Sequence, residues 1–422
     1  MTHSPHIVIL DLQGHKSPLF EWLRTSDWSW SVVEQFFTDD WQPPAGTSLI
    51  VTAQHYEQPF VSVLARLLKQ DAIPVLILAD GILEYRNTWL HPSIAPGAIF
   101  QPVFGHKIAC IGRSQSRVLE SWGNVGKCEV VGSPRFDSLS GQKRRTRSAD
   151  QPFTILIMTA KTPGFTEDQI QNVQDGLADL KNWLSQQTDV QPVWRLTGGL
   201  DQKLGLMPSE SNLQTVPIAE VMKQVDAVIT TPSTAQLEAM YCGLPVALLD
   251  YGNFPHYVPA AWTISASHQI ASVMSELANP PAARMLFQDV SLHDALECRT
   301  PATPRMLELA KQLIEKGTQR AAAGKPVGQI EQILPLDGRA PQVREERFVM
   351  ADLYPEHPFF AETDRERLQV EIGHLKHQLQ KVSQDLTACK EQMQKQSNGR
   401  PPRIKRLWKS LSKRIKRVFA GG

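Results

Sequence analysis

Residues 225–255 read VDAVITTPSTAQLEAMYCGLPVALLDYGNFP, and this stretch decides the fold class. The apolar run at 227–230 predicts a short buried strand, and Thr231 is suited to be the N-cap of a following helix. Gly243 suits the end of that helix, and the run at 246–249 predicts the next buried strand. The segment is therefore predicted to be a strand–helix–strand unit of a parallel sheet.

The start of the predicted helix carries groups that suit a nucleotide. Ser233 and Thr234 place hydroxyls and backbone N–H groups at the helix N-terminus, where a phosphate can bind. Glu238 lies one turn further along the same face, where its carboxylate can accept hydrogen bonds from a ribose. Together these groups predict a site for a nucleotide donor. The alternative is an ordinary capped helix with a solvated Glu238.

Length and composition indicate a globular protein with more than one domain. The chain has 422 residues, of which 41% are hydrophobic and 21% charged, and its net charge is +1. This length suffices for two domains with separate cores. The five cysteines are scattered and form no CxxC pair, which argues against a disulfide framework and a structural zinc site. We expect a reducing compartment, no secretory signal and no membrane-spanning segment.

Alternating strand and helix patterns predict two α/β domains, each with a parallel sheet covered on both faces. Residues 1–139 form the expected first domain, 140–151 a polar and basic linker, 152–316 the second domain, and 317–361 a further linker. No GxGxxG motif follows an early strand, which argues against a dinucleotide-dependent enzyme. The expected strands lie at 7–10, 49–52, 74–78, 107–111, 129–131, 153–158, 192–196, 227–230 and 246–249, and the expected helices at 60–68, 166–184, 270–277 and 305–316.

Residues 362–396 carry a heptad repeat. From Leu368 to Met393, apolar residues recur at alternating spacings of four and three, and Lys, Glu and Gln fill the flanks. This pattern predicts a coiled coil through which the chain forms a homo-oligomer. The alternative is a long surface helix that packs on its own domain.

Residues 400–422 predict a basic amphipathic helix. Seven apolar residues, Trp408 and Phe419 among them, fall on one helical face, and nine Lys or Arg residues cover the remainder. Such a helix suits an anionic membrane surface. Nucleic acid is the rival partner, but it offers the apolar face nothing to bury against. We therefore expect no nucleic-acid partner and a cytoplasmic protein attached peripherally to the inner face of the plasma membrane.

Two parts of the chain resemble a known group of enzymes. Residues 107–112 and 121–137 read KIACIG and SWGNVGKCEVVGSPRFD, and residues 226–258 read DAVITTPSTAQLEAMYCGLPVALLDYGNFPHYV. They resemble GT-B glycosyltransferases that build capsules and other surface polysaccharides, and the related UDP-GlcNAc 2-epimerases and CDP-glycerol glycerophosphotransferases. The resemblance implies two Rossmann-like domains that face a cleft. It implies that Glu238 binds the ribose of the nucleotide donor. It also implies catalysis without a metal or other cofactor, and no DxD motif is evident.

Loops at strand ends supply candidates for a catalytic base. Asp11 and His15 follow the first expected strand, and Asp80 and Glu84 follow the third. Such loops meet at the edge of a parallel sheet where ligands bind. Glycosyl transfer to a hydroxyl needs a base for the acceptor proton, except in retaining enzymes, which react differently. Asp80 is favoured, and the pattern leaves all four open.

The diphosphate that leaves the donor must be neutralised. Without a metal, helix N-termini and cationic side chains do this. Besides Ser233 and Thr234, the candidates are Arg135, Lys161 and Arg195, which lie near expected strand ends. Taken singly, each is as readily explained as a surface or ion-pair residue.

The function favoured by the sequence is transfer of a sugar from a nucleotide-sugar donor to a saccharide or lipid-linked acceptor near the membrane, in cell-surface polysaccharide synthesis. A nucleotide-sugar 2-epimerase is the first alternative, but it needs no lipid acceptor and hence no membrane helix. A catalytically inactive membrane scaffold is the second. The intact set of Ser233, Thr234 and Glu238 argues against the scaffold.

Overall fold

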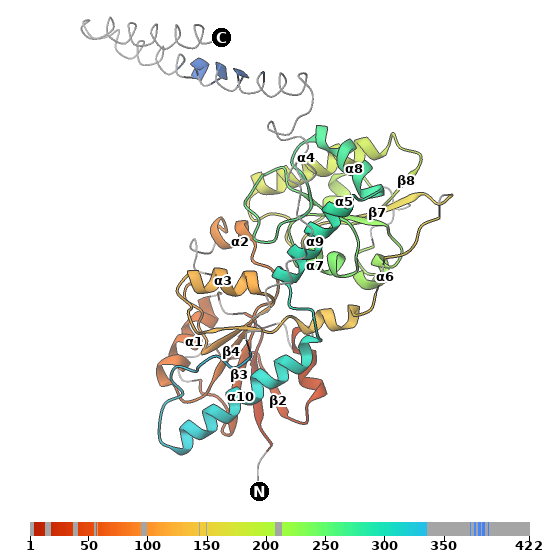
Figure 1. The fold of residues 1–422 in the computed structure, drawn as a ribbon. Helices are drawn as coiled ribbons and strands as arrows, with labels where there is room; N and C mark the ends of the chain where they lie inside the picture. The colour runs from red at the N-terminus through yellow and green to blue at the C-terminus, as the bar shows by residue number, and fades with distance from the viewer. Residues whose placement is uncertain are drawn as a thin grey trace, which may run out of the picture. The chain divides into compact units, whose positions relative to one another are not determined.

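The computed structural model of the chain has two compact units, residues 1–348 and 349–422, each considered by itself. The first unit contains two parallel sheets (Figure 1). The structure describes residues 4–12, 18–36, 41–54, 56, 58–92, 94, 99–142, 144–148, 150–206, 213–335, 372, 375–376, 379–380, 382–384 and 387.

The first sheet has six parallel strands in the order β2-β1-β3-β4-β5-β6. The strand β2 was not expected from the sequence, because it lies at the sheet edge and none of its side chains is fully buried. The strands are β1 (His6–Leu10), β2 (Ser29–Val33), β3 (Thr47–Thr52), β4 (Val75–Leu78), β5 (Lys107–Cys110) and β6 (Cys128–Val130).

Helices cover both faces of this sheet. On one face, α1 (Gln58–Gln70) and α3 (Arg113–Ser121) pack against alternate strand residues. On the other face lie the 3-10 helix η1 (Pro18–Thr25) and α10 (Ala302–Ala322). Two short elements, α2 (Tyr85–Trp89) and the 3-10 helix η2 (Pro134–Leu139), follow β4 and β6.

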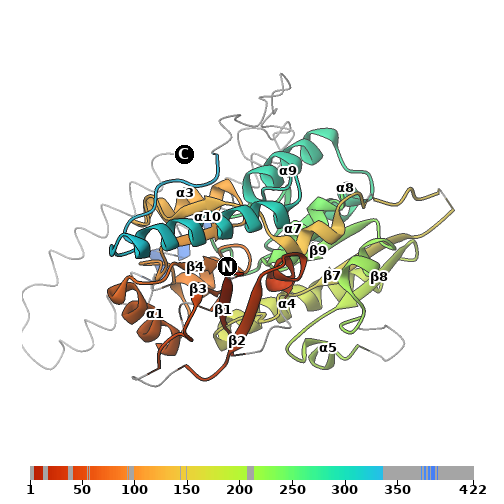
Figure 2. The same cartoon turned by 90° about the horizontal axis from the view of Figure 1, so that it is seen from below.

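The position of α10 corrects the expected domain division. The sequence placed residues 305–316 in the second domain and 317–361 in a linker. Instead, α10 lies along the first sheet (Figures 1 and 2), where Leu309 and Leu313 are fully buried against it. The periodicity of an amphipathic helix shows that it has a buried face, but it does not show which sheet that face covers.

Residues 323–335, here called the C-terminal strap, continue over the first domain. The Glu129 carboxylate on β6 accepts hydrogen bonds from the backbone N–H groups of Ile333 and Leu334, both at 2.9 Å. The carboxylate also accepts from the Gln332 side-chain amide at 2.7 Å and forms an ion pair of 2.6 Å with the ammonium group of Lys107, and the Lys107 and Glu129 side chains are fully buried. The strap is therefore fixed to the sheet edge by a buried charge pair.

The second sheet has five parallel strands in the order β11-β10-β9-β7-β8. Its faces are covered by α4 and α8 on one side and by α6, α7 and α9 on the other. The elements are β7 (Phe153–Met158), α4 (Glu167–Leu184), β8 (Val190–Arg195), α5 (Leu200–Lys203), α6 (Ile218–Met222), β9 (Ala227–Thr230), α7 (Thr234–Tyr241), β10 (Val246–Leu249), β11 (Trp262–Ile264), η4 (Ser267–Gln269), α8 (Ile270–Ala278) and α9 (Ala282–Ala295).

The strand order places a topological switch between β7 and β9. The chain leaves β7 toward β8 on one side and later returns to β9 on the other. In open parallel sheets, ligands bind outside the carboxyl ends of the two strands at such a switch. This position is where the β9–α7 connection lies.

The β9–α7–β10 unit has the predicted order, but its helix starts later than expected. Ser233, not Thr231, is the N-cap. Thr231 still pairs with the neighbouring strand, since its N–H donates to the Met158 carbonyl and its hydroxyl accepts from the Ala160 N–H at 2.8 Å. The helix ends as predicted, with Gly243 in the left-handed region at φ 74°.

The connection between the sheets is held to the second domain. Arg145 donates to both carboxylate oxygens of Asp226, at 2.8 and 2.6 Å, and Asp226 is fully buried. One basic side chain of the expected linker at 140–151, that of Arg145, therefore has a structural role.

The coiled coil and the basic helix that the sequence predicts fall within residues 349–422. Of the heptad positions, the structure describes Ile372, Leu375, Leu379 and Val382 as helical and exposed. The rest of residues 362–396, apart from a few exposed polar positions, and all of 400–422 lie outside the described residues. Oligomer formation and membrane binding therefore stay predictions. Among the helices that the structure describes, none is long and apolar enough to cross a bilayer.

Candidate functional site

Loops from both sheets meet at what we call the interdomain junction. The Ile82 N–H donates to the Thr234 hydroxyl at 3.2 Å, and the Trp89 indole donates to the Tyr257 hydroxyl at 2.7 Å. The first bond starts from the loop after β4 and the second from α2, and both end in the second domain. The junction comprises residues 79–89, 133–136, 160–165, 231–238 and 250–257, which follow the carboxyl ends of β4, β6, β7, β9 and β10.

The approach between the domains requires a glycine. A Cβ atom on Gly81 would lie 1.9 Å from the Thr234 hydroxyl oxygen. The Gly81 carbonyl accepts a hydrogen bond of 3.0 Å from the Gln115 amide, which fixes the loop from the other side. The Thr234 hydroxyl therefore has a role in domain contact, and it keeps its own proton to donate to a ligand.

Ser233 leaves the start of α7 open. Its backbone is extended, and its side chain makes no capping hydrogen bond. Its hydroxyl oxygen is buried and has no hydrogen-bond partner among the described residues, and the same holds for Ser133 at the start of η2. Buried polar atoms normally have a partner. A ligand oxygen at the N-terminus of α7 would provide one for Ser233 and would face the helix N–H groups.

Three charged residues predicted from the sequence come together here. Glu238 is 5% exposed and forms an ion pair with Arg135 of the first domain. Arg195, at the end of β8, lies close enough to feel the Glu238 charge. Burial lowers the pKa of Arg195, and the Glu238 charge opposes this effect. Arg135 thus pairs directly with the buried Glu238, whereas the Arg195 guanidinium donates to the Leu213 and Val216 carbonyls and acts on Glu238 only through its charge.

The remaining diphosphate candidate, Lys161, follows β7 on an exposed loop. It lies at the carboxyl end of one of the two switch strands. This position is compatible with binding a ligand at the switch. The structure shows no hydrogen bond or ion pair between Lys161 and Ser233, Arg135 or Glu238.

Asp80 lies directly beyond β4 in the junction. Asp80 is exposed to solvent. Protein nevertheless surrounds it closely enough that desolvation raises the pKa of its carboxyl group above the usual 3.8, while a backbone hydrogen bond and the Arg135 charge oppose the shift. An accessible carboxyl group with a raised pKa suits proton transfer.

The other candidate bases are placed differently. Glu84 is the N-cap of α2, where its two oxygens accept from the Asn87 N–H at 2.8 Å and from Arg86 at 2.6 Å. Asp11 is buried at the end of β1, two strands away from β4. His15 lies outside the described residues. The geometry therefore favours Asp80 over Glu84.

One pair of polar side chains in the junction was not predicted from the sequence. Asp250 directly follows β10, and its carboxylate contacts His256 at 2.9 Å and accepts from the Phe254 N–H at 2.8 Å. Asp250 is 6% exposed. The available signal was an acidic residue at a strand end with a histidine in the same loop. This pair orients the histidine ring at the rim of the junction.

The described part of the chain contains no evident metal site. No group of three or more His, Cys, Asp or Glu side chains is placed there to hold a metal ion. The positive groups of the junction are instead Arg86, Arg135, Lys161 and the N-terminus of α7, and Arg195 lies outside it at the end of β8.

Comparison by sequence finds nothing: no family model and no curated protein matches the chain. Comparison by structure finds the wall teichoic acid polymerase TagF, which is 11% identical, with 75% of this chain and 90% of that chain covered and a TM-score of 0.50. The chain has the GT-B frame.

The likeness to TagF confirms the predicted GT-B fold, and two further matches have lower TM-scores. MnaA of S. aureus, solved with UDP, also matches, at 11% identity, 74% and 97% coverage and a TM-score of 0.49. A UDP-GlcNAc 2-epimerase of Methanocaldococcus jannaschii, solved with UDP-GlcNAc and UDP, matches at 12% identity, 66% and 94% coverage and a TM-score of 0.45.

Proposed function

We propose that the chain is a glycosyltransferase that takes its sugar from a nucleotide-diphosphate donor bound at the start of α7. The observation that carries this proposal is the buried Ser233 hydroxyl at the topological switch of the second sheet, which has no hydrogen-bond partner in the part of the chain that the structure describes. A diphosphate there would accept hydrogen bonds from Ser233, Thr234 and the helix N–H groups. Such preorganised donors also stabilise the charge that develops on the leaving diphosphate.

Glu238 and Arg135 have linked roles in this proposal. The ribose hydroxyls donate to the Glu238 carboxylate, which now pairs with Arg135. Arg135, which is 31% exposed, then turns to the diphosphate. Donor binding would break the ion pair between Glu238 and Arg135. In its place, the ribose would hydrogen-bond to Glu238, and Arg135 would form a charge-assisted contact with phosphate. Arg195 and Lys161 supply further positive charge.

Asp80 is the proposed base for the acceptor hydroxyl. It lies on the first domain, opposite the proposed donor groups, as acceptor chemistry requires. Glycosyl transfer is preferred to 2-epimerisation because the predicted membrane helix suits an acceptor at a bilayer. We further propose that the coiled coil makes the chain a homo-oligomer and that residues 400–422 hold it at the inner face of the plasma membrane, in cell-surface polysaccharide synthesis.

A donor screen tests this function. Nucleoside diphosphates and their sugar conjugates are added to the full chain, and thermal stabilisation selects the one that binds. The products formed with that donor are then analysed with and without saccharide or lipid-linked acceptors. A new glycosidic bond supports the transferase, and an epimerised sugar without an acceptor points to the 2-epimerase. Absence of stabilisation by every nucleotide contradicts both.

Replacing Glu238 with Ala tests the ribose site. We expect nucleoside diphosphate binding to weaken by about 1.5–3 kcal/mol, because a charged acceptor of hydrogen bonds is lost. Titration calorimetry measures the change. Glu220→Ala is the matched control, since Glu220 forms an exposed ion pair with Lys223 in the same domain. An unchanged dissociation constant in Glu238→Ala would contradict the assignment.

Removing residues 399–422 tests the membrane helix. The shortened chain is expected to lose binding to anionic liposomes, because each basic residue near such a surface contributes about 1 kcal/mol. Sedimentation with anionic and neutral liposomes, at low and high salt, measures this. The full chain should pellet with anionic liposomes only, and less at high salt. Equal pelleting of the two chains would rule out this role for the segment.

A further inference from the structure

The loop after β10 places an acid and a histidine next to the proposed donor site. β10 neighbours β9 in the second sheet, so this loop leaves the sheet beside the connection that leads into α7. Asp250, which directly follows β10, is 6% exposed, and its Oδ2 atom accepts from the Phe254 N–H at 2.8 Å. The same oxygen lies 2.9 Å from Nε2 of His256. The acid thus holds both the turn of the loop and the ring of the histidine.

The segment that follows His256 is bound to both domains. The Tyr257 hydroxyl accepts from the indole of Trp89 on α2 at 2.7 Å, which ties the loop to the first domain. The Val258 carbonyl accepts from the side-chain amide of Gln236 at 3.3 Å, and Gln236 lies in the first turn of α7. His256 is therefore held close to the start of α7 and to the first domain.

The hydrogen bonds of the loop decide which nitrogen of His256 carries a proton. A carboxylate oxygen only accepts, and Oδ2 of Asp250 also accepts from a backbone N–H, so Nε2 of His256 is the donor. Nδ1 has no hydrogen-bond partner in the part of the chain that the structure describes. The side chain is 17% exposed, so a ligand can reach the ring. One ring nitrogen is thus fixed and the other is open.

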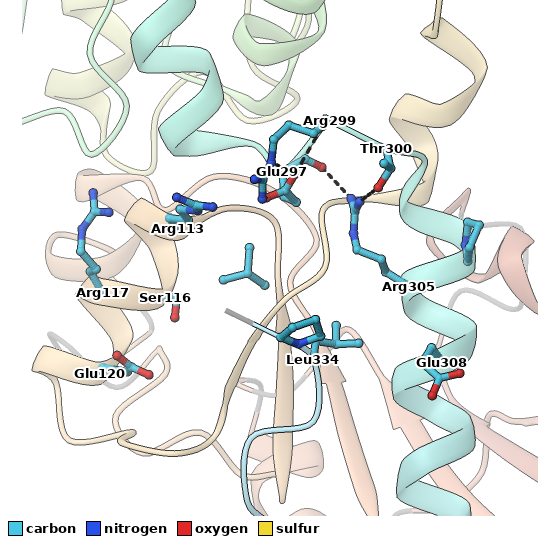
Figure 3. A pocket seen from close by; sticks show the side chains of 13 residues that line it. Arg113, Ser116, Arg117, Glu120, Glu297, Arg299, Thr300, Arg305, Glu308 and Leu334 are labelled. Carbon is cyan, nitrogen blue, oxygen red and sulfur yellow. Dashed lines mark hydrogen bonds and ion pairs between the residues drawn. The ribbon is translucent and has the colours of Figure 1, made fainter. Parts of the chain in front are cut away.

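Charged side chains also surround a cavity of about 630 Å³ at the β6 edge of the first sheet (Figure 3), but its arginines already have partners within the protein. Arg299 forms two bonds with Glu297, at 2.9 and 2.5 Å. Arg305 donates to the Glu297 backbone carbonyl at 2.9 Å. Arg117 forms an ion pair of 2.5 Å with Asp294. These groups stabilise the protein around the cavity, whereas the loop after β10 leaves a polar atom unused.

We propose that His256 donates a proton to the leaving diphosphate and that Asp250 positions it, an inference that rests on the glycosyl transfer proposed above. The leaving oxygen gains negative charge in the transition state, and an N–H group at Nδ1 stabilises that charge. The imidazolium form of His256 supplies this N–H, because the Asp250 carboxylate at Nε2 stabilises the positive ring. The acid then belongs to the domain that binds the donor, and the base, Asp80, belongs to the other domain.

The protons and electrons of this step balance. The bond between the anomeric carbon and the diphosphate oxygen breaks, and its electron pair stays on that oxygen, which takes the Nδ1 proton. The acceptor hydroxyl loses its proton to Asp80 as its oxygen forms the new bond to the anomeric carbon. Asp80 has gained one proton and His256 has lost one, and exchange with water restores both side chains.

The turnover number of His256→Gln tests the proton donor. Glutamine keeps an N–H group for Asp250 but has no proton to give up. The probes are UDP-, CDP-, GDP- and dTDP-linked sugars, and the one from which the unaltered chain transfers its sugar is used throughout. We expect the turnover number to fall by about 10²–10⁴-fold, while KM for the donor changes much less. The matched control is His293→Gln, which alters an exposed histidine–aspartate pair on α9 and should keep its turnover number.

Two further readouts separate catalysis from a structural role. His256→Ala leaves room for free imidazole, which carries the same proton, so added imidazole should raise its turnover number but not that of His293→Ala. Asp250→Asn should also lower the turnover number. Because Asp250 acts through the histidine, the double variant Asp250→Asn/His256→Gln should be no slower than His256→Gln alone. Thermal unfolding shows that each variant is folded.

The unaltered chain separates this inference from the proposed function. If it forms no glycosidic product with any probe, glycosyl transfer is wrong and the role of His256 falls with it. If it transfers sugar and His256→Gln is as fast as His293→Gln, only the role of His256 is overturned. The same holds if imidazole leaves His256→Ala unchanged, or if the effects of the two variants add in full.

Discussion

Replacing Asp80 with Asn is expected to lower the turnover number by about 10²–10⁴-fold, the usual contribution of a positioned general base. The amide cannot accept the acceptor proton, but it keeps the shape of the side chain. Asp80 lies on the first domain, so nucleotide affinity should stay close to that of the unaltered chain. Kinetics with the donor found by the screen measure both quantities. A variant that keeps its turnover number would remove Asp80 from the mechanism.

The pH dependence gives an independent check of the same residue. A base works only when deprotonated, so activity falls as the pH drops through its pKa. Desolvation raises the pKa of Asp80 above 3.8, so activity should be lost at a higher pH than for an ordinary aspartate. Arg135→Gln removes a charge that lowers this pKa, and it should move the acidic limb further upward. A limb that moves downward in Arg135→Gln contradicts this account.

Glu129→Gln is expected to destabilise the first domain by about 3–5 kcal/mol, because it leaves a buried charge without its partner. Lys107 is fully buried, and its ion pair with Glu129 is the buried contact that the variant removes. The amide also places donor hydrogens near the Ile333 and Leu334 N–H groups, which now donate to the carboxylate. Urea unfolding followed by tryptophan fluorescence measures the loss.

The control for this variant is Glu220→Gln, which alters an exposed ion pair and should change stability by no more than about 1 kcal/mol. Because the strap is tied to Glu129, the altered chain should also be cleaved faster by protease within residues 323–335. If Glu129→Gln is as stable as the control and no more sensitive to protease, the pair does not hold the strap.

The sequence predicted nine of the eleven strands in the described part of the chain, all except β2 and β11, and it predicted the β9–α7–β10 unit. Apolar runs bounded by glycine and proline are local signals. The sequence did not predict the exact start of α7. Thr231 has the composition of an N-cap, but its hydroxyl is used by Ala160 on a neighbouring loop. Nor could it assign α10 to a sheet, since that depends on which apolar surface remains uncovered once both domains form.

Part of the candidate site was also predicted, because that part depends on local spacing in the sequence. Ser233, Thr234 and Glu238 lie within one helix turn or two, so their spacing alone brings them together. The pairing of Arg135 with Glu238 joins residues 103 positions apart and depends on how the two sheets meet. The role of Glu84 as a helix cap became visible only with the short helix α2.

Ser233→Asp tests most directly whether a diphosphate binds at the start of α7. Aspartate is a favourable N-cap and interacts well with the helix dipole, so thermal stability should be kept or raised. Its negative charge occupies the proposed phosphate position and repels the ligand. We expect calorimetry to show nucleoside diphosphate binding weakened by about tenfold or more, with the affinity for the uncharged nucleoside unchanged. If Ser233→Asp is stably folded and binds the diphosphate as tightly as the unaltered chain, the donor does not lie at α7.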